Sequence, residues 1–207
     1  MENREKNDNI YFENLRPQPN FLPMSMAEMR DLGHETVDFV LITGDAYIDH
    51  PSFGAAIIGK FLWAQGFSVG IIAQPNIENP NNFKIFGAPR LGFLITSGNV
   101  DSMVNNYTVA KKRRKRDVYS PNGIAKNRPD RALTVYSRKI RDIFGRGMLV
   151  IIGGIEASLR RLAHYDYWSD KIRKSVLIDS CADILVYGMG ERTCAEIAAY
   201  LSQGAKI

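Results

Sequence analysis

The hydrophobic pattern of the chain alternates between short apolar runs and stretches with helical spacing. The apolar runs cover residues 37–43, 68–73, 91–96, 148–152 and 183–187. Each run predicts a strand, and the first has no polar face at its end, which is typical of a strand covered on both sides. After it, Phe53, Ile57 and Phe61 recur at helical spacing up to Gly66. This pattern predicts a helix, so the first unit is a strand, a polar turn and a helix.

Further helices are expected between and after the strands. Ser25 and Glu28 form a capping box for a short helix, and a brief helix follows Ser102. Asp130 is expected to cap a longer helix, and residues 191–202 form the last one. Five strands separated by helices and crossovers predict an α/β fold, with a doubly wound, mainly parallel five-stranded sheet in flavodoxin-like order. We expect a polar N-terminal arm over residues 1–20 and one α/β domain over residues 21–207.

Composition narrows the class of protein. The chain has 207 residues, of which 45% are hydrophobic, so it can bury a proper core. No apolar run approaches the roughly 20 residues of a membrane helix, and the polar start lacks the apolar centre of a signal peptide. The two cysteines fit a reducing compartment. We therefore expect a cytoplasmic protein with no membrane partner.

Four polar turns are predicted to meet at the carboxyl edge of the sheet, where such folds bind ligands. They cover residues 44–52, 97–101, 153–158 and 188–191. The candidate catalytic residues, none of them certain, are Asp45, Asp49, His50, Glu156 and His164. The candidate ligand-binding residues are Thr43, Gly44, Tyr47, Ser52, Ser97, Gly98, Asn99, Asp101, Gly153, Gly154, Ser158, Arg160, Arg161, Gly188 and Glu191.

Structural roles remain open for several of these candidates. Asp49 could cap the following helix, and His50 could hydrogen-bond within its loop. The arginines Arg160 and Arg161 suit recognition of a carboxylate or phosphate, or an internal ion-pair network. Neither a G-x-G-x-x-G nor a G-K-[ST] motif follows any strand, which weakens a phosphate-nucleotide interpretation.

The two cysteines give no metal site. Cys181 and Cys194 lie 13 positions apart without histidines at ligand spacing. We predict no metal ligand set in this chain. Cys194, on a helix among alanines, is expected to be a small core residue.

Six consecutive cations run from Lys111 through Arg116 (KKRRKR). Such a run can neutralise nucleic-acid phosphates. No aromatic residue interleaves with it, so the sequence gives no stacking platform of the kind that single-strand binders use. We favour a solvated loop and expect no nucleic-acid partner, with nucleic-acid binding through this run as the lesser alternative.

Long stretches of the chain resemble one family. They include FLPMS at 21–25, TGDAYIDHPSFG at 43–54, TSGNVDSMVNNYT at 96–108, RPDRA at 128–132 and GGIEASLRRLAHYDYWSDKIRKSVLIDS at 153–180. Together they resemble the N-terminal region of the YgiQ-type radical SAM proteins. The resemblance extends from about Phe21 to the end of the chain.

The resemblance implies a larger protein than this chain. Family members carry a following barrel whose C-x-x-x-C-x-x-C motif holds a 4Fe–4S cluster that binds S-adenosylmethionine. This sequence lacks the motif. We therefore expect the chain to be a fragment or one part of a split protein, and to be catalytically incomplete alone. The implied role is to cover or shape the active site of a barrel, in cis or as a separate subunit.

The resemblance also implies a layout similar to cobalamin-binding domains. The D-x-H-x-x-G signature of histidine-ligating corrinoid domains is not met, because Ile48 stands at the aspartate position and Gly54 follows His50 by four positions. Cobalamin binding without a protein ligand stays open. The alternative function is therefore a stand-alone module for a corrinoid- or nucleotide-like ligand. The substrate and the oligomeric state do not follow from the sequence.

Overall fold

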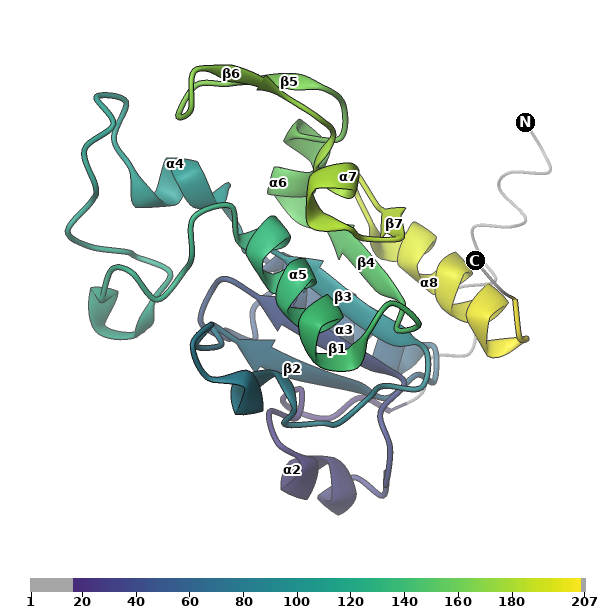
Figure 1. The fold of residues 1–207 in the computed structure, drawn as a ribbon. Coiled ribbons are helices and arrows are strands. Elements are labelled where there is room, and N and C mark those ends of the chain that lie inside the picture. The colour runs from purple at the N-terminus through teal and green to yellow at the C-terminus, as the bar shows by residue number, and fades with distance from the viewer. Residues whose placement is uncertain (1–16, 206–207) are drawn as a thin grey trace, which may run out of the picture.

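A five-stranded parallel sheet forms the centre of the computed structural model, which describes residues 17–205 (Figure 1). Most of the predicted N-terminal arm, residues 1–16, lies outside the described residues. The strand order is β2-β1-β3-β4-β7, which confirms the predicted doubly wound layout. The strands are β1 (Phe39–Thr43), β2 (Val69–Ala73), β3 (Gly92–Thr96), β4 (Val150–Gly153) and β7 (Ile184–Leu185).

The central strand β1 is buried along its whole length and pairs on both sides. Phe39 lies opposite Val69 on one side and Gly92 on the other. This position explains the run without a polar face, because a strand covered by helices above and below has no water-facing side. The predicted fifth strand is reduced to Ile184–Leu185 at the edge of the sheet.

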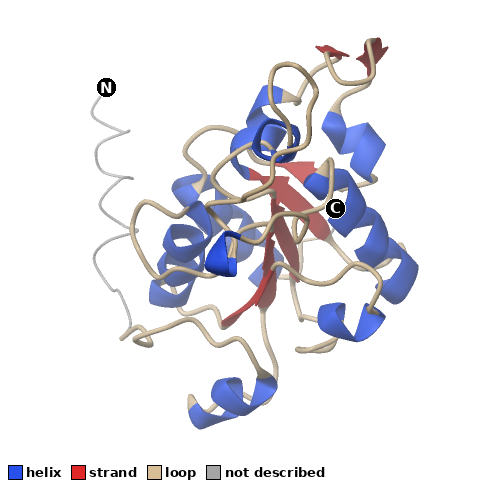
Figure 2. Cartoon of the chain, turned by 90° about the vertical axis from the view of Figure 1, so that its left-hand side faces the viewer, coloured by secondary structure: helices blue, strands red, loops and turns tan. Residues whose placement is uncertain are grey.

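Helices cover both faces of the sheet (Figures 1 and 2). On one face α3 (Gly54–Ala64) packs against α8 (Glu191–Ser202), and on the other α5 (Ala132–Phe144) packs against β3 and β4. The short helix α7 (Val176–Ser180) lies beside α5. None of the helices within residues 17–205 has the length and apolar character that crossing a membrane requires.

Smaller elements decorate this core. They are α2 (Met26–Asp31), α4 (Ser102–Asn106), α6 (Gly154–Leu159), the 3₁₀ helices Pro80–Phe83 and Pro121–Gly123, and an antiparallel hairpin of β5 (His164–Asp166) and β6 (Lys171–Arg173). At α2, Ser25 Oγ accepts from the backbone N–H of Glu28 at 3.2 Å. The carboxylate of Glu28 accepts in return from Met24 N. The expected capping box therefore forms, except that Glu28 accepts from the residue before the N-cap and not from Ser25 itself.

The predicted cap of α5 is wrong. Arg131, and not Asp130, occupies the N-cap position, and its φ is 52°. The free N–H groups of Ala132 and Leu133 are taken by Ser102 Oγ at 3.1 Å and Glu156 Oε1 at 3.4 Å. Asp130 accepts instead from the Tyr107 hydroxyl at 2.6 Å. Acceptors from distant segments therefore replace the local one that the sequence suggested.

Candidate functional site

A cavity of about 320 Å³ opens at the carboxyl edge of the sheet. Its floor is made by apolar strand residues, among them Leu41, Leu94 and Ile152, and its side by Ile58 of α3 and Cys194 of α8. All four predicted turns contribute to its wall. The cavity therefore lies where a doubly wound sheet places its ligand crevice.

The structure brings about half of the predicted site residues to this cavity. Those that line it are Thr43, Asp45, Tyr47, Ser52, Gly98, Asn99, Gly153, Gly154, Gly188 and Glu191. Those that do not line it are Gly44, Asp49, His50, Ser97, Asp101, Glu156, Ser158, Arg160, Arg161 and His164.

Two glycines in these turns allow a close approach that a side chain would prevent. Gly98 has a φ of +103°, and a Cβ there would lie 2.1 Å from Asp45 Oδ1. Gly154 has a φ of +84°, and its Cβ would lie 2.5 Å from Thr96 Oγ1. Both the backbone conformation and the space require glycine. The turns after β1, β3 and β4 are thereby packed together at the cavity.

Asp45 is held by a buried arginine. Arg128 Nη2 donates to Asp45 Oδ1 at 2.5 Å, and the other carboxylate oxygen accepts from Asn99 N at 2.7 Å. Arg128 Nη1 also donates to the backbone oxygens of Ser97 and Val100. Burial raises the pKa of Asp45, and the charge of Arg128 opposes that rise. Asp45 is thus engaged in binding two turns together.

Asp49 and His50 lie outside the cavity. Asp49 pairs with Lys60 of α3 at 2.5 Å and does not cap that helix, whose N-cap residue Phe53 makes no side-chain cap bond. His50 Nδ1 lies 2.6 Å from the hydroxyl of Ser52. The imidazole is therefore bonded within its own loop.

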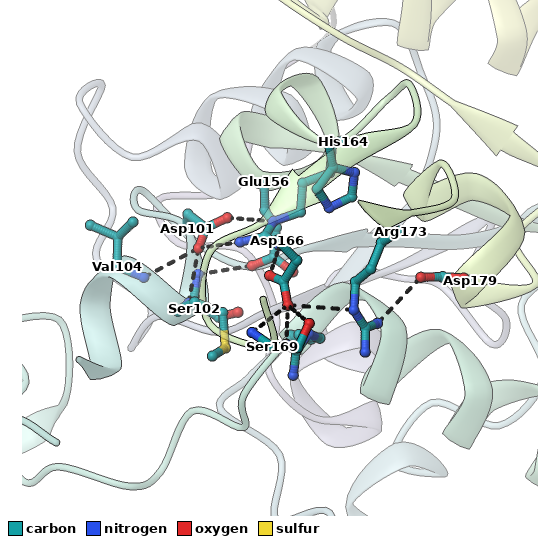
Figure 3. A network of polar contacts seen from close by, with 12 residues as sticks. Asp101, Ser102, Val104, Glu156, His164, Asp166, Ser169, Arg173 and Asp179 are labelled. Carbon is teal, nitrogen blue, oxygen red and sulfur yellow. Dashed lines mark hydrogen bonds and ion pairs between the residues drawn. The ribbon is translucent and has the colours of Figure 1, made fainter. Parts of the chain in front are cut away.

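A second polar cluster is an internal ion-pair network (Figure 3). Arg160 makes two hydrogen bonds to Asp101, at 2.8 and 3.0 Å, and reaches Asp166 at 3.3 Å. Asp166 also accepts from Arg131 at 2.6 Å and lies 3.5 Å from Arg173. These contacts join α4, the start of α5 and the β5–β6 hairpin.

Glu156 occupies the buried side of the same cluster. Its Oε2 accepts from Ser102 N at 2.8 Å and its Oε1 from Leu133 N. Burial, together with the nearby charge of Asp101, raises the pKa of Glu156. It therefore serves the N-termini of α4 and α5 and does not line the cavity.

His164 and Arg161 lie at the margin of the network. His164 Nδ1 is 3.1 Å from the backbone oxygen of Leu162, and its buried Nε2 has no partner among residues 17–205. Arg161 donates to Ser158 O and lies over the ring of Tyr187. Ser158 in turn accepts from Gly188 N at 3.0 Å, which joins the third and fourth turns.

The described residues offer no metal centre. Within residues 17–205 no group of three or more histidine, cysteine, aspartate or glutamate side chains is placed to hold a metal ion. Cys181 is exposed and Cys194 is buried, as expected for a small core residue. Burial raises the pKa of the Cys194 thiol to about 12.

Sequence reasoning missed the residues that hold the site together. Arg128 was visible in the RPDRA stretch, but nothing local pointed to its partner 83 positions away. It also missed the apolar rim of the cavity, where Ile48, Ile155 and Met189 are exposed. Exposed apolar residues in polar turns were the available signal.

The fold and its edge cavity define a doubly wound α/β domain with a ligand-type crevice. The family model described as Radical SAM N-terminal matches residues 21–207, and the chain belongs to this family.

Comparison with curated relatives supports the same family assignment. A UPF0313 protein of Pseudomonas syringae pv. tomato is 56% identical over 92% of this chain and 24% of its own length. A UPF0313 protein of Clostridium botulinum strain 657 is 54% identical over 90% of this chain and 29% of its own length. The chain thus spans about a quarter of the length of these relatives. No solved structure matches it significantly.

Proposed function

We propose that this chain is the amino-terminal domain of a longer radical SAM enzyme and that its carboxyl sheet edge covers or shapes the active site formed by the following barrel. The observation that carries the proposal is the cavity of about 320 Å³ at that edge, with its exposed apolar rim. A cavity of this size falls within the range of small-molecule sites.

The rim is unusually apolar for a water-facing surface. Met189 is 84% exposed and Ile48 45% exposed, and Ile155 lies with them around the cavity mouth. Leu159, Leu162 and Tyr187 extend the exposed apolar surface across the end of α6 and the turn after β7. Several exposed apolar side chains on neighbouring turns favour contact with another protein surface.

The occupant that we infer is the remaining part of a longer polypeptide. The stretch that the relatives share with this chain is 24% of the length of one and 29% of the length of the other. A following domain in cis has a high effective concentration, so a modest apolar rim is enough to dock it. Docking would close the cavity and exclude water from a shared site.

The 4Fe–4S cluster of the proposed enzyme does not fit the residues of this chain. Three thiolates hold such a cluster, and the chain has two cysteines, of which Cys194 is buried. Residues outside this chain would hold the cluster, which would supply the radical chemistry there. The residues here would position and cover the substrate, and we assign them no chemical step.

The test uses the longer protein with this domain at its amino terminus and its cluster reconstituted without oxygen. Met189→Asp places a carboxylate on the rim, and we expect it to lower formation of 5′-deoxyadenosine about tenfold or more by weakening the docked state. Ile178→Asp is the matched control, because Ile178 is also an exposed apolar residue but lies on α7. Equal turnover in the Met189→Asp variant and the parent protein would contradict the proposal.

A stand-alone ligand-binding module is the second candidate, and the same cavity favours it. Its floor is apolar and its walls carry the glycine turns 153–154 and 188–190, which suits a planar ring compound. Titration of the 207-residue chain with hydroxocobalamin and with S-adenosylmethionine tests this candidate. Binding of neither at millimolar concentration would remove it.

A further inference from the structure

The basic run from Lys111 through Arg116 is part of an ordered segment. Tyr107 and Arg113 form an antiparallel bridge, and Arg116 forms another with Ile124. Thr108 N donates to Lys112 O at 2.9 Å, and Arg114 N donates to Asn106 O at 2.8 Å. All six cations are exposed. The backbone therefore presents them on a fixed local frame.

The fold supplies the aromatic residues that the sequence around the run lacks. The β5–β6 hairpin brings Tyr167 and Trp168 beside it, and the Tyr167 hydroxyl donates to Val109 O at 2.7 Å. The ammonium of Lys111 lies 4.6 Å from the centre of the Tyr167 ring. The rings of Tyr107 and Trp168 are 5.4 Å apart. We name Tyr107, the cations 111–116, Tyr167 and Trp168 the basic–aromatic surface.

Most of the positive charge on this surface is not neutralised by the protein. Among residues 17–205, the side chains of Lys112, Lys115 and Arg116 have no ion-pair or hydrogen-bond partner. Arg113 is 3.7 Å from Asp130 and lies over the Tyr107 ring. Asp130, which also accepts from Tyr107, is the one carboxylate paired with the six cations among the described residues. The surface therefore has a strong local excess of positive charge, which attracts polyanions.

We propose that the basic–aromatic surface binds single-stranded nucleic acid. The cations contact successive phosphates, and Tyr167, which is 44% exposed, offers part of its ring to an unpaired base. Closely spaced cations match regularly spaced phosphates, and the aromatic rings beside them match planar bases. An acidic protein offers no planar bases, so a nucleic acid fits this surface better. This inference does not depend on the proposed radical enzyme, because it concerns a different surface.

The surface and the cavity lie toward the same end of the domain. In Figure 1 the loop after α4 and the β5–β6 hairpin both extend beyond the ends of the central strands. Ala46 N in the first turn of the cavity donates to Tyr119 O, which belongs to the same loop as the basic run. A nucleic-acid strand bound on the basic–aromatic surface would therefore lie near the cavity mouth.

The experiment measures binding of the 207-residue chain to a labelled 15-nucleotide oligouridylate and to a deoxythymidylate of equal length, over a series of salt concentrations. The charge variant is Lys112→Gln, Lys115→Gln and Arg116→Gln together. Each lost phosphate contact on a single strand lowers the slope of log K against log salt by about 0.7. We expect the slope to fall by about 2 and the affinity at low salt by tenfold or more.

A matched charge control removes three cations elsewhere. The variant Lys84→Gln, Lys139→Gln and Arg146→Gln has the same net charge as the charge variant but leaves the basic–aromatic surface intact. We expect its slope to equal that of the parent chain. Equal losses in the two triple variants would contradict the proposal, because binding would then follow overall charge alone.

A ring variant separates base stacking from charge. Tyr167→Leu removes the ring, whereas Tyr167→Phe keeps the ring and removes only the bond to Val109 O. We expect Tyr167→Leu to lower the affinity for the oligonucleotide about fivefold or more and Tyr167→Phe to leave it unchanged. Neither variant should change the binding of polyphosphate, which has no bases.

Three results would overturn the proposal. They are no binding of either oligonucleotide at about 50 mM salt, tighter binding of a duplex than of the single strands, and displacement of the oligonucleotide by polyglutamate as effective as by unlabelled oligonucleotide. The last result would assign the surface to an acidic protein.

Discussion

Arg128 lies fully buried with its Nη2 2.5 Å from Asp45 Oδ1, although the two residues are 83 positions apart. The Asp45 carboxylate also accepts from Asn99 N. The pair therefore fastens the long loop after α4 to the turns that follow β1 and β3. The shape of the cavity wall depends on this contact, because Asp45, Gly98 and Asn99 all line the cavity.

Breaking this pair should be costly. Arg128→Met leaves the buried carboxylates of Asp45 and Asp117 without their cation, and we expect the free energy of unfolding to fall by about 3–5 kcal/mol. The double variant Asp45→Asn, Arg128→Met removes both charges and should lose less than the sum of the single variants. Urea unfolding followed by circular dichroism measures all of them. Additive losses would show that the two groups do not interact.

The partly exposed pair of Asp49 and Lys60 is the control for that experiment. Their side chains are 14% and 27% exposed. Because water screens such a pair, Lys60→Met should change the free energy of unfolding by about 1 kcal/mol or less. A loss as large as that of Arg128→Met would mean that burial does not set the cost.

Gly98→Ala should disrupt the same contact from the backbone side. The new Cβ would lie 2.1 Å from Asp45 Oδ1, at a φ of +103° that alanine rarely adopts. We expect destabilisation of about 2 kcal/mol or more in urea unfolding. Gly147→Ala is the matched control, since a Cβ there meets nothing within 4 Å. A Gly98→Ala chain as stable as the Gly147→Ala chain would refute this account of the turn.

Asp166 should make the chain sensitive to acid. Burial by itself raises its pKa, but hydrogen bonds from Ser169 and Arg131 outweigh that effect and hold the pKa well below its ordinary value of 3.8. The unfolded chain therefore takes up this proton first. The stabilisation by ionised Asp166 is complete above about pH 4 and is lost as the pH falls toward the lowered value.

The check compares urea midpoints of the parent chain and Asp166→Asn between pH 7 and pH 2. The variant should be less stable at pH 7 and should lose less stability on acidification. Glu196→Gln, which alters an exposed pair with Arg192 on α8, serves as control. Parallel curves for Asp166→Asn and the parent would show that Asp166 does not contribute to the acid response.

The two cysteines should differ sharply in reactivity. Cys181 is exposed, whereas Cys194 is buried and its thiol pKa is raised to about 12. Since the thiolate is the reactive form, iodoacetamide at pH 8 should label Cys181 in the native chain and both residues in urea. Peptide mass spectrometry reads out the sites. Labelling of native Cys194 as fast as Cys181 would contradict the packing of α8 against α3.

The sheet could be predicted because its strands are buried on both faces. A short apolar run such as that of β1 predicts a buried strand, and the polar turn after the run marks the carboxyl end of that strand. From five such units the flavodoxin-like order and the edge that carries the cavity both followed. The sequence was less informative at β7, where only two residues pair at the sheet edge.

Contacts between distant segments were beyond the sequence. Nothing near Asp130 reveals that Ser102 and Glu156 would supply the acceptors for α5 in its place. The β5–β6 hairpin escaped prediction because each of its strands has three residues. With that hairpin unseen, the aromatic partners of the basic run were unseen as well.

The central claim is that the carboxyl sheet edge is the face that a following domain covers. Hydrogen exchange measured by mass spectrometry on the longer protein, compared with the 207-residue chain, tests it most directly. The account predicts slower exchange in residues 44–55, 153–162 and 187–191 of the longer protein, with no change in residues 138–146 at the end of α5. Unchanged exchange around the cavity, or protection only at α5, would contradict it.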